Sequence, residues 1–457
     1  MPSPPIVQYA SRTDVGMRRA ANQDSLAVRL CSDFDEWERC GHLFVVADGM
    51  GGHAVGDLAS RITVDTLPHA YFKRDAPTVQ SRMRQAIHAA NKAINDRGRE
   101  NREFEGMGTT CSVLSLTQEG AIVGHVGDSR VYRVRGGHIE QLTFDHSLQW
   151  EMIRLGRATV ENVELFHPRN VITRCLGPDP VVQVDIEGPF SVKAGDCFIL
   201  CSDGVTNHIT DTEIGQTVGT LPPAESSRLL INLANCRGGS DNSTVIVVGI
   251  DNYPETVSEA ASELPETPKL DRTMDIPAKP SGIGQILLSG AAVLCLLTGI
   301  VLGVMAKYIP AAILVAASVL SWLISRRMKS NHPEKNSDEF STAESSAVAA
   351  GMPIESLSSS SISRPSVPTV AFNPKSPYRV VDATVSDAFV SYLAEMQSDL
   401  VQAAKDSAWD VDFDEVTTLN KQAGTAQQSG KSVQSIRSRA RAIELLMHEM
   451  YLRSRSS

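Results

Sequence analysis

Five short motifs of the 457-residue chain each place an aspartate directly after an apolar run or inside a tight turn. They are RRAANQDS (18–25), VVADGMGGH (45–53), VGDSR (126–130), CSDGV (201–205) and GGSDNSTV (238–245). A carboxylate at such a position contributes little to core packing, so five of them need a shared explanation. Carboxylates and water are the ligands that Mg²⁺ and Mn²⁺ prefer, and two such ions close together lower the pKa of a shared water. The motifs therefore predict a two-metal centre that attacks a phosphoryl group, without choosing between the two metals.

Glycines follow two of these aspartates, Asp48 and Asp203. Glycine lets the backbone turn sharply beside the carboxylate, and Gly49 could also offer its carbonyl oxygen to a metal. Cys111 and Cys201 lack the Cys-x5-Arg loop that cysteine-dependent phosphatases use. A covalent phosphoenzyme is therefore not expected.

Runs rich in β-branched residues and bounded by glycine or aspartate predict the strands that carry the motifs. These runs are 42–49, 109–116, 121–135, 197–204 and 243–250. Gly136-Gly137 predicts a hairpin turn inside one strand pair, and residues 54–73, 78–102 and 151–155 have helical spacing. Because the helices cluster between groups of strands rather than alternating with them, the sequence favours an α+β architecture.

Taken in order, RxxNQDS, DGMGGH, GMGTT, GDSR, SDG and DNST resemble the bacterial metal-dependent protein phosphatases of type 2C. Each motif alone occurs by chance in many proteins, whereas all six in this order over residues 9–251 are specific. The resemblance implies two packed antiparallel β-sheets flanked by α-helices, an α-β-β-α sandwich. It also implies a protein serine/threonine phosphatase that depends on two Mn²⁺ or Mg²⁺ ions, with a third ion as an option.

The same resemblance assigns metal-binding roles to Asp24, Asp48, Gly49, Asp128, Asp203 and Asp241. Asp48 would bridge two ions, Asp203 and Asp241 would complete their coordination, and Asp24 would act mainly through water. Asp128 corresponds to a residue tied to a third, weaker metal.

Arg19 matches the arginine that holds the substrate phosphate, which suits a guanidinium because it can grip two phosphate oxygens at once. The adjacent Arg18 is the alternative, since only one of two neighbouring arginines in a turn is expected to face the cleft. His53 is a candidate donor of the proton that the leaving alkoxide needs. A purely structural role for His53 at the start of a helix is equally open.

The expected reaction is direct attack on phosphoserine or phosphothreonine by a hydroxide that bridges two divalent metals. Phosphorylated proteins, among them serine/threonine kinases and their substrates, are the expected partners. The alternative is a binding or scaffold protein with a degenerate phosphatase fold. Four intact aspartates of the motifs, Asp24, Asp48, Asp203 and Asp241, argue against it. A net charge of −10 argues against a general nucleic-acid binder.

Two long apolar stretches, 286–306 and 308–325, lie C-terminal to the motifs and predict a transmembrane helical hairpin within residues 283–325. One span plus a re-entrant helix is the alternative. Lysine and arginine on both flanks place both flanks in the cytoplasm, and the N-terminus lacks the pattern of a signal peptide. The sequence thus predicts a multi-pass protein of the inner (cytoplasmic) membrane whose catalytic domain, linked through residues 252–282, faces the cytoplasm.

Residues 326–378 are rich in serine and proline and predict a disordered linker. Helical periodicity returns in the C-terminal region (379–457), at 387–409 and 435–453. A docking module, a coiled coil and a pair of solvated helices all remain compatible with that pattern.

Overall fold

The computed structural model describes residues 4–51, 55–73, 76–159, 162–163, 168, 171–254 and 379–454. Within those ranges no helix is both long enough and apolar enough to cross a membrane. The predicted hairpin (283–325), the predicted linker 326–378 and His53 lie outside the described residues and remain predictions.

One antiparallel sheet has the strand order β1-β11-β10-β7-β8-β12. Its strands are β1 (Val7–Asp14), β11 (Ser243–Ile250), β10 (Cys197–Cys201), β7 (Arg130–Arg135), β8 (His138–Gln141) and β12 (Arg379–Asp382). The tight turn between β7 and β8 is formed by Gly136 and Gly137, both with positive φ, which confirms the predicted hairpin.

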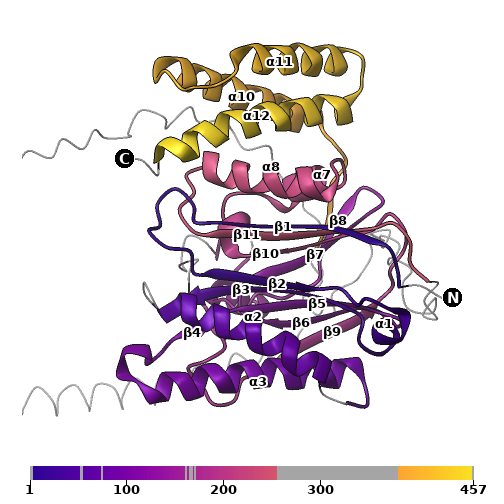
Figure 1. Cartoon of the computed structure of the whole chain (residues 1–457), viewed down its shortest axis with the longest axis vertical. Coiled ribbons are helices and arrows are strands. Elements are labelled where there is room, and N and C mark those ends of the chain that lie inside the picture. Colours follow the sequence, from indigo (N-terminus) through magenta and orange to yellow (C-terminus); the bar gives the residue numbers. More distant parts are fainter. Residues whose placement is uncertain are drawn as a thin grey trace, which may run out of the picture. The chain divides into compact units, whose positions relative to one another are not determined.

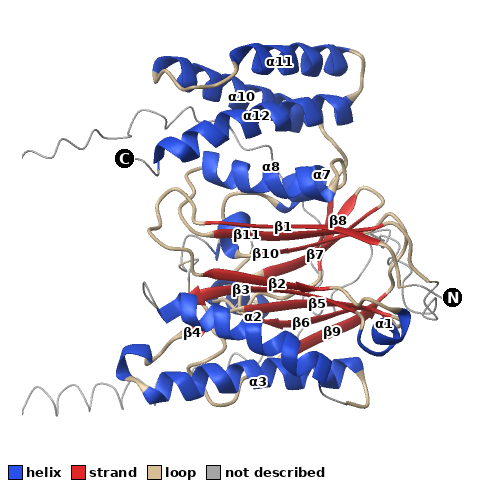
Figure 2. Cartoon of the chain, viewed as in Figure 1, coloured by secondary structure: helices blue, strands red, loops and turns tan. Residues whose placement is uncertain are grey.

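The other antiparallel sheet has the order β2-β3-β5-β6-β9, with the short strand β4 paired to β3. Its strands are β2 (Asp24–Arg29), β3 (His42–Met50), β4 (Gly108–Thr109), β5 (Cys111–Thr117), β6 (Gly120–Val126) and β9 (Asp185–Phe190). Figure 2 shows the two sheets as stacked layers between helices, which confirms the predicted packing of two antiparallel sheets flanked by helices.

Central strands such as β3, β5 and β10 are buried along nearly their whole length because each sheet is covered on both faces. In β3, Phe44 and Val46 join a buried cluster that also contains Phe198 and Leu200 of the other sheet. The alternate residue Val45 packs in a second cluster, with side chains from the helices α2 and α3. The period-two alternation of side chains thus fills the space between the sheets and the space under the helices.

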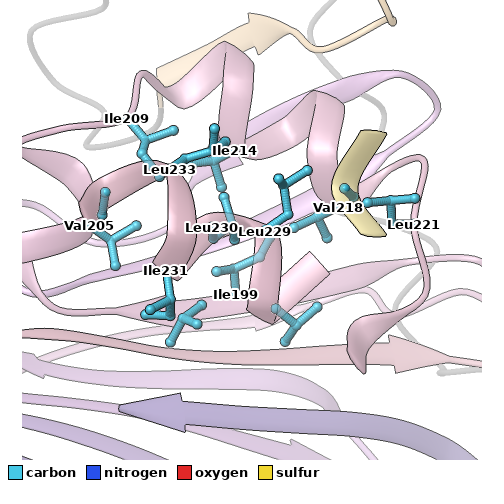
Figure 3. Close-up of a cluster of buried hydrophobic side chains, with 14 of the residues drawn as sticks. Ile199, Val205, Ile209, Ile214, Val218, Leu221, Leu229, Leu230, Ile231 and Leu233 are labelled. Atoms are coloured by element: carbon cyan, nitrogen blue, oxygen red, sulfur yellow. The ribbon is translucent and has the colours of Figure 1, made fainter. Parts of the chain in front are cut away.

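Helices cover the two outer faces of this sandwich. The second sheet is covered by α2 (Val55–Lys73) and α3 (Val79–Glu100), and the first by α7 (Asp211–Val218) and α8 (Pro223–Cys236) (Figure 1). Shorter elements are α1 (Phe34–Cys40), a 3₁₀ turn (Arg102–Phe104), α4 (Leu148–Arg154) and α6 (Asp203–Thr206). Figure 3 shows part of the core between α8 and the first sheet, where Leu230 and Leu233 lie with Ile199 of β10.

The C-terminal region adds both a strand and three helices to the first sheet's side of the fold. Strand β12 pairs antiparallel with β8, and α10 (Asp387–Asp406), α11 (Phe413–Gln428) and α12 (Ser432–Ser454) follow it. We call residues 379–454 the C-terminal module. Helix α12 lies on α8 (Figure 1), and buried side chains of β12, α10 and α12 share one hydrophobic cluster with α7 and α8. The module is therefore packed on the same folded unit as the motifs.

Candidate active site

Asp24 and Asp48 face each other across the ladder between β2 and β3, where their Cα atoms are register partners. Side chains of directly opposed residues point to the same face of a sheet and lie about 5 Å apart at Cβ. Burial raises the pKa of Asp24 to about 7, against hydrogen bonds from Thr244 and Ser202 that lower it. Burial and the charges of Asp24 and Asp203 raise the pKa of Asp48 well above its usual range.

Asp203 and Asp241 come from the other sheet, at the ends of two neighbouring strands. Asp203 begins α6 directly after β10, and Asp241 lies two residues before β11. Burial, followed by the charge of Asp241, raises the pKa of Asp203, and a hydrogen bond with Asp48 opposes that rise. Ser202 Oγ donates a hydrogen bond of 2.7 Å to Asp24 Oδ2, which ties the two sheets together at this point.

Asp128 lies in the turn between β6 and β7 and is buried. Burial and the charges of Asp203 and Asp145 raise its pKa to about 8. The structure thus brings all five predicted aspartates into one electrostatic cluster where the two sheets meet.

The donor chemistry of this cluster fits hard divalent cations. Among the described residues, Asp24 Oδ1, Asp128 Oδ1 and Asp203 Oδ1 are buried and have no hydrogen-bond partner. A buried carboxylate oxygen without a partner is costly, and a cation offsets both that cost and the mutual repulsion of the carboxylates. In the described part of the chain, however, no three acidic, histidine or cysteine side chains are close enough together to hold a metal ion as they stand. The residues therefore fit the metals by chemistry, although those that are described do not form a closed ligand set.

Gly49 can only be a glycine because of what surrounds it. A Cβ atom there would lie 2.1 Å from the carbonyl oxygen of Gly56 and 2.7 Å from that of Gln23. The Gly49 N–H donates to the Gln23 carbonyl oxygen at 3.1 Å. The close approach holds β3, and Asp48 with it, against the segment that carries Asp24. The predicted role of the Gly49 carbonyl as a metal ligand stays a prediction.

Of the two neighbouring arginines, Arg19 is the one that touches the aspartate cluster. Its Nη2 forms an ion pair of 2.7 Å with Asp241 Oδ2, and its side chain remains half exposed. Arg18 instead lies beside the loop at Gly238, since a Cβ on that glycine would be 3.9 Å from Arg18 Nη2. A cation at the open rim of a carboxylate cluster is suited to receiving a phosphate dianion.

Three polar residues that hold the aspartates in place were missed by the sequence analysis. Thr110 Oγ1 accepts a hydrogen bond of 2.9 Å from Asp48 N, and Ser202 binds Asp24 as described. The Asn242 side chain accepts from Gln23 N at 2.8 Å and donates to two carbonyl oxygens of the segment 15–21. All three belong to the quoted motifs GMGTT, SDG and DNST, so membership of a motif was the available signal.

The turn that carries Asp128 is fixed by side chains from the segment after β8. Gly127 N donates to His146 Nδ1 at 3.0 Å, and Gly127 O accepts from His146 N at 2.7 Å. Arg130 holds the neighbouring Asp145 through both carboxylate oxygens, at 2.6–3.0 Å. Ser129 contacts Thr110 at 2.8 Å between the two hydroxyl oxygens. The position of Asp128 therefore depends on Asp145 and His146.

An Asp185→Asn substitution should test the support of this turn, because it should change how the stability of the protein depends on pH. Although burial raises the pKa of Asp185, hydrogen bonds and charges from His146 and Arg174 lower it to about 2. Because the folded-state pKa lies below the ordinary value of 3.8, the carboxylate stabilises the fold above about pH 4, and that contribution is lost as pH falls toward 2. We expect the variant to unfold with about 1 kcal/mol less free energy at pH 7, because water screens this half-buried carboxylate and reduces its contribution. Urea unfolding at pH 7 and pH 3 should show a smaller difference at pH 3.

Asp96→Asn is the matched control, because Asp96 forms an exposed ion pair with Lys92 one turn away on α3. Exposed pairs contribute less than about 1 kcal/mol. A difference between wild type and Asp185→Asn that does not change with pH would contradict the assigned role of the carboxylate.

Only part of the segment after α4, residues 157–170, is described. In the described part, Val163 packs with Trp150 and Ile153 of α4.

Comparison with known proteins supplies a family context for this geometry. The family model of protein phosphatase 2C matches residues 17–221. A putative protein phosphatase 2C-type of Streptococcus pyogenes is 38% identical over 247 residues, which are 53% of this chain and 97% of that protein. Protein phosphatase PhpP of Streptococcus pneumoniae is 36% identical over 244 residues, 52% of this chain and 96% of PhpP. Serine/threonine protein phosphatase PstP of Mycobacterium tuberculosis is 32% identical over 251 residues, 54% of this chain and 46% of PstP.

Solved structures of the same kind are also similar. The catalytic domain of the serine/threonine protein phosphatase PstP in complex with two manganese ions is 32% identical, with a TM-score of 0.46 over 54% of this chain and 99% of that one. The serine/threonine phosphatase of S. agalactiae is 34% identical, with a TM-score of 0.48 over 54% of this chain and 100% of that one.

Proposed function

Because this chain belongs to the protein phosphatase 2C family of metal-dependent serine/threonine protein phosphatases, we propose that its aspartate cluster hydrolyses phosphoserine and phosphothreonine without a covalent phosphoenzyme. The observation that carries this proposal is the meeting of five aspartates from two sheets, three of them with a buried oxygen that has no hydrogen-bond partner in the described part of the chain. When bound, two Mn²⁺ or Mg²⁺ ions would supply the attacking hydroxide, bridged between them, and offset the charge on the phosphoryl oxygens.

Residues of this chain would bind the metals, hold the phosphate and supply a proton. We propose that Asp48, Asp203 and Asp241 hold the metal pair, with Asp24 acting through water and Asp128 serving a third ion. Arg19, at the rim, would exchange its contact with Asp241 for two oxygens of the substrate phosphate and keep phosphorus facing the cluster. The leaving alkoxide would take its proton from water or from His53.

The full chain in detergent provides the direct test. It should hydrolyse a phosphothreonine peptide in the presence of Mn²⁺ and stop when EDTA is added, with activity restored by excess Mn²⁺. Hydrolysis that is unaffected by EDTA, or no hydrolysis by correctly folded protein in Mn²⁺, would overturn the proposal.

Arg19→Ala should separate the two neighbouring arginines. Removing a cation that stabilises a phosphoryl group should lower kcat/KM by about 100-fold. Arg18→Ala is the matched control, because Arg18 lies beside Gly238 rather than on the cluster, and its kcat/KM should stay within about threefold of wild type. Steady-state kinetics on the phosphothreonine peptide measure both. The reverse ranking would assign the phosphate to Arg18.

We also propose that the enzyme is held at the cytoplasmic membrane by a hairpin within residues 283–325, with phosphoproteins near that surface, including serine/threonine kinases, as its substrates. The pairing of β12 with β8 supports an even number of crossings. A single span between residues 254 and 379 would put β12 on the opposite side of the bilayer from its partner strand. A reporter fused after Ser457 should therefore be cytoplasmic, and a periplasmic signal would contradict the hairpin.

A further inference from the structure

A buried ionic network connects the C-terminal module to the turn that carries Asp128. Asp211 at the start of α7 accepts hydrogen bonds from Arg379 of β12 and, at 2.9 Å, from Tyr132 of β7. Arg130 Nη1 also forms an ion pair with Asp211 Oδ1, at 3.5 Å. The shorter contacts of Arg130 go to Asp145, at 2.6–3.0 Å, and to the Tyr132 hydroxyl, at 3.1 Å. Arg130 therefore stands between two buried carboxylates.

The register of the first sheet explains why Arg379 reaches this network. Arg379 is the Cα partner of Gln141, Gln141 that of Tyr132, and Tyr132 that of Ile199. Residues in one such row project to the same face of the sheet. Gln141 Nε2 also donates to Asp145 Oδ1 at 2.9 Å, so the row contacts both carboxylates of the network.

Charge balance gives Arg379 a role beyond packing. Asp145 and Asp211 are both buried, and two guanidinium groups, those of Arg130 and Arg379, face them. Although burial raises the pKa of Asp211, the charges of Arg379 and then Arg130 bring it below its usual range. Without Arg379, one guanidinium would have to serve two buried carboxylates, and an uncompensated buried charge is strongly unfavourable. Arg130 would then be drawn toward Asp211 and away from Asp145.

We propose that Arg379 is a positioning residue for the active site: it neutralises Asp211, leaves Arg130 on Asp145, and so fixes the Gly127–Arg130 turn that carries Asp128. The proposal rests on the function proposed above and adds a form of control to it. Arg379 lies outside the matched family region, residues 17–221. The second cation is thus supplied by a segment outside that region, and the docked C-terminal module favours a formed Asp128 site.

Arg379→Met in the full chain tests this, since methionine keeps an apolar stem and removes the charge. We expect the Mn²⁺ concentration for half-maximal activity to rise about three- to tenfold. Calorimetric titration with Mn²⁺ alone should show weakened binding, and hydrogen exchange should be faster at the amides of residues 127–131. Arg379→Lys should recover most of each readout, because it restores the positive charge.

Arg437→Met is the matched control. Arg437 joins the same module to α8 through an exposed ion pair with Glu225 and does not contact Asp211. It should leave the Mn²⁺ dependence unchanged. In an Asp211→Asn background the further change Arg379→Met should have little effect, because the carboxylate that needs the cation is gone.

The outcomes separate this inference from the function on which it rests. A wild-type chain without Mn²⁺-dependent hydrolysis would remove the proposed function. An active wild type whose Arg379→Met and Arg437→Met variants respond equally to Mn²⁺ would overturn the role of Arg379, as would full additivity of Arg379→Met with Asp211→Asn.

Discussion

An Asp48→Asn chain should lose phosphatase activity by about 10²- to 10³-fold in kcat while keeping its fold. Asp48 is the register partner of Asp24, shares a hydrogen bond with Asp203, and feels the charges of Asp128 and Asp241. Asp48 therefore interacts with aspartates of both sheets. An amide of the same shape cannot supply a negative charge to a cation pair, so metal binding should fail with little change in packing.

The same variant should be more stable than wild type when metal is absent. Burial and neighbouring carboxylates raise the pKa of Asp48 well above its usual range, so the folded state binds more protons than the unfolded chain. The Asp48 carboxyl therefore costs stability above about pH 4, and the neutral amide removes that cost. Thermal unfolding in EDTA at pH 7 should show a higher Tm for Asp48→Asn.

The control for both measurements is Asp57→Asn. Asp57 is a partly exposed aspartate of α2 that pairs with Arg61 one turn away. It should change neither kcat nor the metal-free Tm appreciably. Wild-type activity in Asp48→Asn would refute the central place given to this carboxylate, and a lowered metal-free Tm would refute the repulsion argument.

Strands β3, β5, β6, β7, β10 and β11 were predictable because strong local patterns coincide with the fold there, whereas β1, β2 and β9 were not predicted. The run His42–Gly49 is apolar on both faces, and the structure uses both, with Phe44 between the sheets and Val45 against the helices. Gly136-Gly137 marks its hairpin correctly because a two-residue turn needs positive φ at both positions. The order of the motifs then indicated the five aspartates that lie together in the structure.

The pairing of those residues could not be derived from the sequence alone. The choice between Arg18 and Arg19 depends on where a turn faces, and it is Arg19 that contacts Asp241, 222 residues away. Local spacing contains no information about such a long-range contact. The same holds for the bond from Ser202 to Asp24, across 178 residues.

Strand β12 was missed for a related reason. Its four residues, Arg379–Asp382, are too few to show a period, and β12 becomes a strand by extending the exposed edge of β8. The helical periodicity of α10 and α12 was clear, but three interpretations of it remained open because the complementary surface lies on α7 and α8. The intervening α11 was not predicted at all.

Removing the C-terminal module should destabilise the catalytic domain. This is expected even though the streptococcal relative is matched over 97% of its own length by only 53% of this chain. In this chain one hydrophobic cluster contains residues of both parts. The module contributes Val381, Ala383, Phe389, Val390, Leu393, Met396, Ile436, Ala440, Ile443 and Met447. A chain that ends at Pro254 would expose the surfaces of α7 and α8 that these side chains cover. Each buried large apolar side chain is worth about 1.5–3 kcal/mol, so even after the ordering entropy of the module the loss should reach several kcal/mol.

Differential scanning calorimetry of the full and shortened chains measures this loss, and point variants make it specific. Leu393→Ala should cost about 2–5 kcal/mol, because Leu393 is 0% exposed in the shared cluster. Leu452→Ala is the matched control, since Leu452 is 53% exposed on the same module, and it should stay within about 0.5 kcal/mol of wild type. Adding residues 379–457 as a separate fragment should raise the Tm of the shortened chain. The shortened chain could instead have the Tm of the full chain, and Leu393→Ala could leave the free energy of unfolding unchanged. In that case the module does not stabilise the catalytic domain, and Arg379 cannot position its active site.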